Sequence, residues 1–100
     1  MGLLTGRVAI ISGIGPGMGR DAALACVREG ANVVLASRTP TKVESVAEEV
    51  EALGGKALAI PTDVTDLSQI SDLIESTLTA FGSIDVLVNN AFAQPPFATL

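Results

Sequence analysis

The chain has 100 residues, of which 48% are hydrophobic and 17% are charged. This length and composition fit one small domain with a buried core, and they exclude a disordered segment. Eleven acidic residues against six basic ones give a net charge of −5, which argues against nucleic acid as a partner.

Four short apolar runs predict β-strands, at residues 8–11, 33–36, 57–60 and 86–88. Each run is continuously apolar instead of alternating, which is typical of strands covered on both faces of a parallel sheet. Segments with helical periodicity separate the runs, so the order predicts an α/β domain.

A glycine-rich turn, Ser12-Gly-Ile-Gly-Pro-Gly-Met-Gly19, follows the first predicted strand. Gly13, Gly17 and Gly19 lie where a strand must turn into a helix, a position that allows a tight turn and a close approach of the backbone to a pyrophosphate. The spacing matches neither G-x-G-x-x-G nor the Walker pattern. A purely structural strand-to-helix turn is therefore the alternative interpretation.

The first helix is predicted over residues 17–29, with small side chains that would let it approach a sheet closely; among them Cys26 is interpreted as a packing residue and not a reactive thiol. The second strand then ends at Ser37-Arg38. A carboxylate near this place would suit the ribose hydroxyls of NAD, whereas an arginine suits the 2′-phosphate of NADP. Arg38 predicts NADP, with an ordinary surface cation as the alternative.

The second helix is predicted to start at Thr39-Pro40, with a hydroxyl N-cap and a proline at the first helical position, and to end at Gly54-Gly55. Apolar residues at spacings of three or four predict its buried face, and they are Val43, Val46, Ala47, Val50 and Leu53. The glutamates off that face are interpreted as a solvated surface and not as a metal cluster, and they are Glu44, Glu48, Glu49 and Glu51.

Asp66 and Gln69 have the spacing of a capping box and predict the start of a third helix, which would stop at Gly82. The last predicted strand follows it. Pro95-Pro96 excludes a helix or a central strand from residues 90–100.

Cys26 is the only cysteine, so we expect no internal disulfide and a reducing cytoplasm as the compartment. No charged leader precedes an apolar stretch, and no apolar run reaches the ~18 residues of a spanning helix, so no membrane association is expected.

Three features together resemble the short-chain dehydrogenase/reductase family. They are Gly13-x-x-x-Gly17-x-Gly19 after the first strand, Asp63-Val64 after the third, and Asn89-Asn90-Ala91 after the fourth. The resemblance implies a Rossmann-type, doubly wound parallel sheet. Right-handed crossover connections between the strands predict the strand order 3-2-1-4. It also implies an oxidoreductase that acts on a small carbonyl or secondary alcohol substrate and forms a homo-oligomer.

The resemblance further implies a role for individual positions in cofactor binding. Asp63 would bind the adenine amino group while Val64 packs on the ring, although Asp63 could also be a simple turn residue. Asn90 and Ala91 would border the nicotinamide-side ribose, while Phe92 replaces the glycine of the family pattern. The positions expected to contact the rest of the cofactor are Gly13, Gly15, Pro16, Gly17, Met18, Gly19, Ser37 and Arg38.

The residues that perform the family's proton transfer cannot be located in this chain. It contains no Tyr and no His, so a Tyr-x-x-x-Lys pair is absent, and Lys42 and Lys56 fall in the adenine half. The expected topology also leaves one sheet face half covered and the fourth strand at an edge. We therefore expect residues 1–100 to be a single, partial dinucleotide-binding domain that is inactive alone.

Two other functions compete with this interpretation. A nucleotide-binding module without catalysis, or a truncated remnant, would need no proton relay. A methyltransferase-like domain also uses a glycine-rich turn, but it would favour an acidic residue where Ser37-Arg38 stands.

Overall fold

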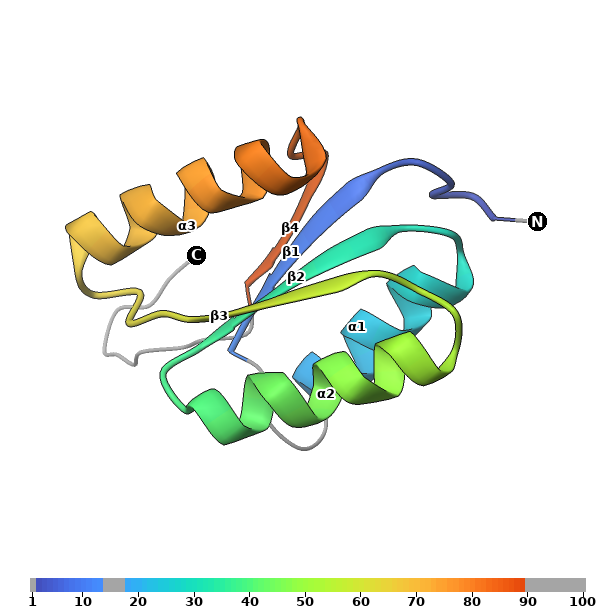
Figure 1. Cartoon of the computed structure of the whole chain (residues 1–100), viewed down its shortest axis with the longest axis horizontal. Helices are drawn as coiled ribbons and strands as arrows, with labels where there is room; N and C mark the ends of the chain where they lie inside the picture. Colours follow the sequence, from blue (N-terminus) through green and yellow to red (C-terminus); the bar gives the residue numbers. More distant parts are fainter. Residues whose placement is uncertain (1, 14–17, 90–100) are drawn as a thin grey trace.

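The computed structural model describes residues 2–13 and 18–89, and it shows a four-stranded parallel sheet between two layers of helices (Figure 1). The strands are β1 (Val8–Ser12), β2 (Asn32–Ser37), β3 (Ala57–Pro61) and β4 (Val86–Asn89). The helices are α1 (Met18–Arg28), α2 (Pro40–Ala52) and α3 (Leu67–Phe81). The sheet order β3-β2-β1-β4 confirms the predicted topology and the α/β fold class.

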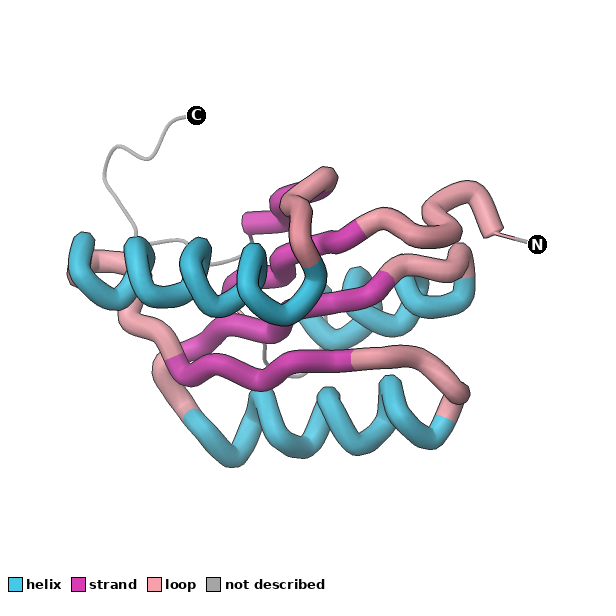
Figure 2. The backbone as a smooth tube through the Cα atoms, turned by 45° about the horizontal axis from the view of Figure 1, so that its top comes forward, coloured by secondary structure: helices cyan, strands magenta, loops and turns pink. Residues whose placement is uncertain are grey.

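The helices α1 and α2 cover one face of the sheet, and α3 covers the other (Figures 1 and 2). Alternate residues of β1 therefore enter different cores: Ala9 and Ile11 face α1 and α2, whereas Val8 and Ile10 face α3. All four are buried, which explains why the strand sequence is continuously apolar.

The core on the α1 and α2 face is the larger of the two. It joins strand residues such as Leu35 to Val43, Val46 and Val50, three residues of the predicted apolar face of α2. Leu53, however, is 55% exposed, because α2 ends at Ala52 and Leu53 is the C-cap residue outside the helix. The prediction that Leu53 completes the buried face was wrong.

The start of α2 differs in one detail from the prediction. Thr39 is the N-cap and Pro40 follows it, but among the described residues no N–H of the helix is bonded to the Thr39 side chain. The backbone N–H of Thr39 instead donates to the Ser37 hydroxyl at 3.4 Å. The Ser37 side chain, at the end of β2, thus contacts the turn that leads into α2.

The glutamates of α2 are not all solvated. Glu49 accepts hydrogen bonds from the guanidinium of Arg20, which lies in the first turn of α1, and the pair joins the two helices on one face of the sheet. This bond holds the pKa of Glu49 below its ordinary value. In the part of the chain that the structure describes, no group of three or more His, Cys, Asp or Glu could hold a metal ion.

The sheet face under α3 is less completely covered. Leu73 is buried against it, but Ile74 and Leu78 are 42% and 45% exposed. Leu87 of the edge strand β4 is 65% exposed. No helix within residues 2–13 and 18–89 is long and apolar enough to cross a membrane.

Candidate functional site

The carboxyl ends of the parallel strands meet at one edge of the sheet, which is where open α/β sheets bind their ligands. Ser12 ends β1 and pairs in register with Ala36 of β2 on one side and with Asn89 of β4 on the other. It is buried, with 4% of its surface exposed. The helices that follow β1 and β2 cover one face of the sheet, whereas β4 is reached through α3 on the other face, so this edge is the topological switch point.

Gly13 begins the glycine-rich turn at this edge. Its φ of 77° lies in the left-handed region, which a side chain would strain. Its N–H donates to the carbonyl of Ala36 at 2.9 Å, so the turn starts from a position fixed against β2. The glycine there is required by the backbone geometry, as the sequence predicted.

The rest of the glycine-rich turn is only partly described. Gly15, Pro16 and Gly17 lie outside the described residues, whereas Met18 is the first residue of α1 and Gly19 is buried in its first turn. The turn thus leads from the carboxyl end of β1 into the N-terminus of a helix of 11 residues. Such an N-terminus presents free N–H groups and a partial positive charge, which suit a pyrophosphate.

The ends of β2 and β3 are joined beyond the last residues of the strands. Ser37 pairs in register with Pro61, and its carbonyl accepts a hydrogen bond of 2.7 Å from the N–H of Thr62. Thr62 is 2% exposed, and its hydroxyl donates to the carbonyl of Ile60 at 2.9 Å. These bonds bring the two residues that follow, Arg38 and Asp63, to the same place.

Arg38 and Asp63 line one pocket of about 230 Å³, together with Pro61, Thr62 and Gln69. The guanidinium and the carboxylate therefore approach the same volume from neighbouring strand ends. Arg38 is exposed, so its charge is accessible to a ligand. The sequence predicted Arg38 and Asp63 as ligand contacts from separate motifs, and the structure brings them together.

Hydrogen bonds hold the Asp63 carboxyl in its charged form. Its Oδ1 accepts from the N–H and the hydroxyl of Thr65, at 2.9 and 2.6 Å. These bonds are the main reason why the pKa of Asp63 is lowered, and the positive charge of Arg38 lowers it further. An ionised carboxylate accepts hydrogen bonds only, which suits an exocyclic amino group of a base.

The structure does not place the remaining predicted residues in this pocket. Val64 is 36% exposed in the turn after Asp63 and is not among the residues that line this pocket. Asn89 ends β4 beside Ser12, but Asn90 and Ala91 lie outside the described residues. The nicotinamide end of the predicted site is therefore not described, whereas the adenine end is.

Sequence reasoning missed the part that Gln69 plays in this pocket. The capping-box pattern places its side chain against the backbone N–H of Asp66, but that N–H donates to the carbonyl of Asp63 instead. The Gln69 amide oxygen accepts from the N–H of Asp63 at 2.8 Å, and its nitrogen lies 3.3 Å from Oδ2 of Asp66. The available signal in the sequence was the position of Asp63, three residues before the N-cap Asp66.

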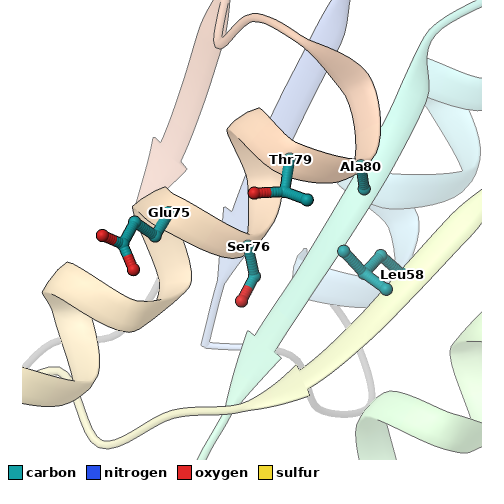
Figure 3. Close-up of a pocket in the computed structure, with 5 residues that line it drawn as sticks. All are labelled: Leu58, Glu75, Ser76, Thr79 and Ala80. Carbon is teal, nitrogen blue, oxygen red and sulfur yellow. The ribbon is translucent and has the colours of Figure 1, made fainter.

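A second pocket, of about 310 Å³, lies between α3 and β3 (Figure 3). Figure 3 shows Leu58 of β3 facing the helix that carries Ser76 and Thr79. Of the residues that line it, only Glu75 is charged, so this pocket lacks the cation that a phosphate needs.

The residues at the first pocket and the glycine-rich turn fit a nicotinamide dinucleotide. A left-handed glycine opens the turn, a helix N-terminus follows it, and Arg38 comes directly after β2, which contains no acidic residue. The negative Asp63 and the positive Arg38 on one pocket match a base amino group and a phosphate on one nucleotide.

Comparison with known proteins supports the same assignment. The chain is 44% identical over 99 residues to hydroxysteroid dehydrogenase-like protein 2 of Xenopus laevis, covering 92% of this chain and 24% of that protein. The human protein of the same name is 42% identical with the same coverage. The chain thus spans about a quarter of the length of these relatives.

Solved structures are similar over most of this chain. A hydroxysteroid dehydrogenase from Escherichia coli superposes with a TM-score of 0.86 at 36% identity, covering 90% of this chain and 38% of that one. A short chain dehydrogenase from Mycobacterium smegmatis gives 0.85 at 34% identity, covering 91% and 39%. The short chain dehydrogenase family, whose members are oxidoreductases that use NAD or NADP, matches residues 7–99. This chain belongs to the short-chain dehydrogenase family.

Proposed function

We propose that this chain is the NADP-binding part of an oxidoreductase that transfers a hydride between the nicotinamide and a carbonyl or secondary alcohol. The observation that carries the proposal is the pocket at the ends of β2 and β3, which Arg38 and Asp63 line together.

Each end of the adenosine half would have its own partner. The Arg38 guanidinium would pair with the 2′-phosphate, and the Asp63 carboxylate would accept a hydrogen bond from the adenine amino group while Val64 packs on the ring. Ser37, which ends β2, would lie beside the ribose. Two features support Arg38 in this role: its exposure and the absence of an acidic residue at the end of β2.

The phosphates and the nicotinamide half would use the remaining predicted positions. The pyrophosphate would lie against the turn that begins at Gly13 and against the first turn of α1. Backbone N–H groups would bind it, those of Gly15, Gly17, Met18 and Gly19, with Pro16 lining the same turn. Asn90 and Ala91 would border the nicotinamide-side ribose. The bound cofactor would supply the hydride, and these residues would only bind and orient it.

The chemical step would use the family's Tyr-x-x-x-Lys proton relay, which these 100 residues do not contain. There is no Tyr and no His in the sequence, so no Tyr-x-x-x-Lys relay can be formed from it. We infer that residues 1–100 form a partial domain, that the relay lies in the remainder of a longer protein, and that this protein is a cytoplasmic homo-oligomer. The coverage of 38 to 39% of the similar solved structures supports the first of these inferences.

The absence of Tyr and His equally favours a second candidate function, a nucleotide-binding module without catalysis. The two functions differ in turnover and agree in binding. Both also differ from a simple structural turn, which would bind no dinucleotide.

The test is a titration of the whole protein with NADPH and, separately, with NADH. Binding is monitored by the fluorescence emission of the reduced nicotinamide. The chain contributes no Trp or Tyr that could transfer excitation to it. We expect NADPH to bind about tenfold to a hundredfold more tightly than NADH, since a charged hydrogen bond contributes about 1.5–3 kcal/mol. If the protein bound neither NADPH nor NADH, the proposal would be overturned. If it bound NADH more tightly than NADPH, the NADP assignment would be overturned.

Turnover separates the two candidate functions. The oxidoreductase reading predicts steady-state oxidation of secondary alcohols or reduction of carbonyls by the whole protein, and none by residues 1–100 alone. Binding of NADPH by the whole protein without any turnover across a panel of alcohols and ketones would favour the non-catalytic module. Turnover by the 100-residue chain would contradict the argument from the missing relay.

A further inference from the structure

Gln69 lies where the pocket lined by Arg38 and Asp63, which we call the adenine pocket, meets the N-terminus of α3. It belongs to both the pocket and the helix. Its side chain lines the pocket with Arg38 and Asp63, and it also sits in the first turn of the helix. A residue that only capped the helix would have no reason to contact the backbone of Asp63. Its amide oxygen nevertheless accepts the Asp63 N–H at 2.8 Å.

Asp63 is held from three sides by residues that follow it. Its carbonyl accepts from the N–H of Asp66 at 3.0 Å, and its Oδ1 accepts from Thr65. The bond to Gln69 fixes the third polar group, the N–H of Asp63 itself. Of these contacts, that bond alone ties Asp63 to a side chain within α3, because Thr65 and Asp66 both precede Leu67.

The other half of the Gln69 amide is anchored to the helix cap. Its nitrogen is 3.3 Å from Oδ2 of Asp66, whose Oδ1 accepts from the N–H groups of Ser68 and Gln69. Both ends of the amide are thus used, and the amide has one orientation that satisfies both bonds. The Gln69 amide therefore links the position of the N-terminus of α3 to the position of Asp63 in the pocket.

We propose that Gln69 is a positioning residue for the adenine-binding pocket: its amide bridges the Asp66 cap and the Asp63 N–H, and so fixes the Asp63 carboxylate toward the base. This inference rests on the proposed dinucleotide function and deepens it, because it assigns to α3 a part in recognising the adenosine half. It also makes the capping residue and the binding carboxylate one connected unit.

The test is Gln69→Met in the whole protein, which keeps the length of the side chain and removes both hydrogen bonds. The affinity for 2′,5′-ADP should fall about threefold to tenfold, as expected for the loss of a net hydrogen-bond contribution. The affinity for nicotinamide mononucleotide should stay within about twofold. The KM for NADP should rise by a similar factor while kcat is unchanged, because the reacting ring is bound at the other end.

Ser71→Met is the matched control, since it introduces the same side chain at an exposed position of the same helix. It should leave the affinities for both fragments unchanged. Amide hydrogen exchange without ligand gives a second measurement: the Asp63 N–H should exchange faster in Gln69→Met than in the wild type or in Ser71→Met.

The outcomes separate this inference from the function on which it rests. If 2′,5′-ADP binds the wild type and Gln69→Met equally well, the positioning role is refuted and the proposed function stands. If Gln69→Met loses both fragments equally, the residue is merely structural and the inference also fails. If the wild type binds no 2′,5′-ADP, the proposed function itself fails, and this inference with it.

Discussion

Arg38 and Asp63 follow neighbouring strands and line one pocket, with opposite charges. The pKa of Asp63 is lowered chiefly by the hydrogen bonds from Thr65, and the charge of Arg38 adds to that effect. Because both groups remain accessible, each can bind a different part of one ligand. The parallel pairing of β2 with β3, extended by the bond from the Thr62 N–H to the carbonyl of Ser37, keeps the two strand ends together.

Acid should destabilise the fold through hydrogen-bonded carboxyls, three aspartates and Glu49, whose pKa is lowered in the folded chain. Asp63, Asp66 and Asp85 all have lowered pKa values in the folded chain, with hydrogen bonds as the first cause. A lowered folded pKa stabilises the protein above the unfolded value of about 3.9, and this stabilisation is lost as the pH falls through the folded pKa. The free energy of unfolding, measured in urea, should therefore be flat between about pH 5 and 7 and should decline below about pH 4.

Asp85 offers the variant for that prediction. Its Oδ2 accepts from the N–H of Val8 at 2.9 Å, and its own N–H donates to the carbonyl of Val8. Asp85→Asn should reduce the slope of the decline below pH 4, whereas Asp72→Asn, at an exposed site on α3, serves as the control. A slope that is the same in both variants would show that Asp85 is not one of the groups responsible.

Gly13 should be required for its backbone conformation and for ligand binding. Gly13→Ala places a side chain at a φ of 77°, and it should cost about 1–2 kcal/mol of stability. It should also weaken NADPH binding, because the turn that follows would start in a different direction. Stability is read from chemical unfolding and binding from a titration at a temperature where the variant is folded.

Gly82 is the matched control for Gly13. It ends α3 with a φ of 85° and has open space around it, so Gly82→Ala imposes a similar backbone strain away from the proposed site. It should lower stability without changing the affinity of the folded protein for NADPH. Equal effects of the two variants on affinity would argue that Gly13 has no special role in binding.

Leu35 and Leu53 test the division between buried and exposed apolar residues. Leu35 of β2 is fully buried on the sheet face covered by α1 and α2, so Leu35→Ala should cost about 2–5 kcal/mol. Leu53→Ala should change stability by less than about 0.5 kcal/mol, because the side chain is already 55% exposed. A large cost at Leu53 would restore the interpretation drawn from its helical spacing.

The order of the elements, their approximate bounds and the glycine at the first turn could be predicted from the sequence, because apolar periodicity and backbone strain are local properties. The strand order could be predicted from the handedness of the crossover connections. Leu53 shows where this fails: its spacing fits the buried face of α2, but the helix ends one residue before it. Glu49 shows a second limit, since its partner Arg20 is 29 residues away and no local pattern joins them.

The pocket lined by Arg38 and Asp63 lies between these two cases, since it could be predicted in part. Arg38 and Asp63 were each predicted from their strand ends, but their common pocket depends on the pairing of β2 with β3. Gln69 could be assigned only to a helix cap, because its bond to Asp63 depends on the exact turn between them. The roles of Asn90 and Ala91 stay predictions, since both lie outside the described residues.

The central claim is that Arg38 recognises a 2′-phosphate, and Arg38→Glu tests it most directly. Lys42→Glu, with the same change of charge at an exposed site early in α2, is the control. Titration with NADPH and NADH should show that Arg38→Glu weakens NADPH by about a hundredfold and NADH by less than about threefold, since a paired phosphate becomes a repelled one. Equal losses for the two cofactors, or the same response in Lys42→Glu, would contradict the account.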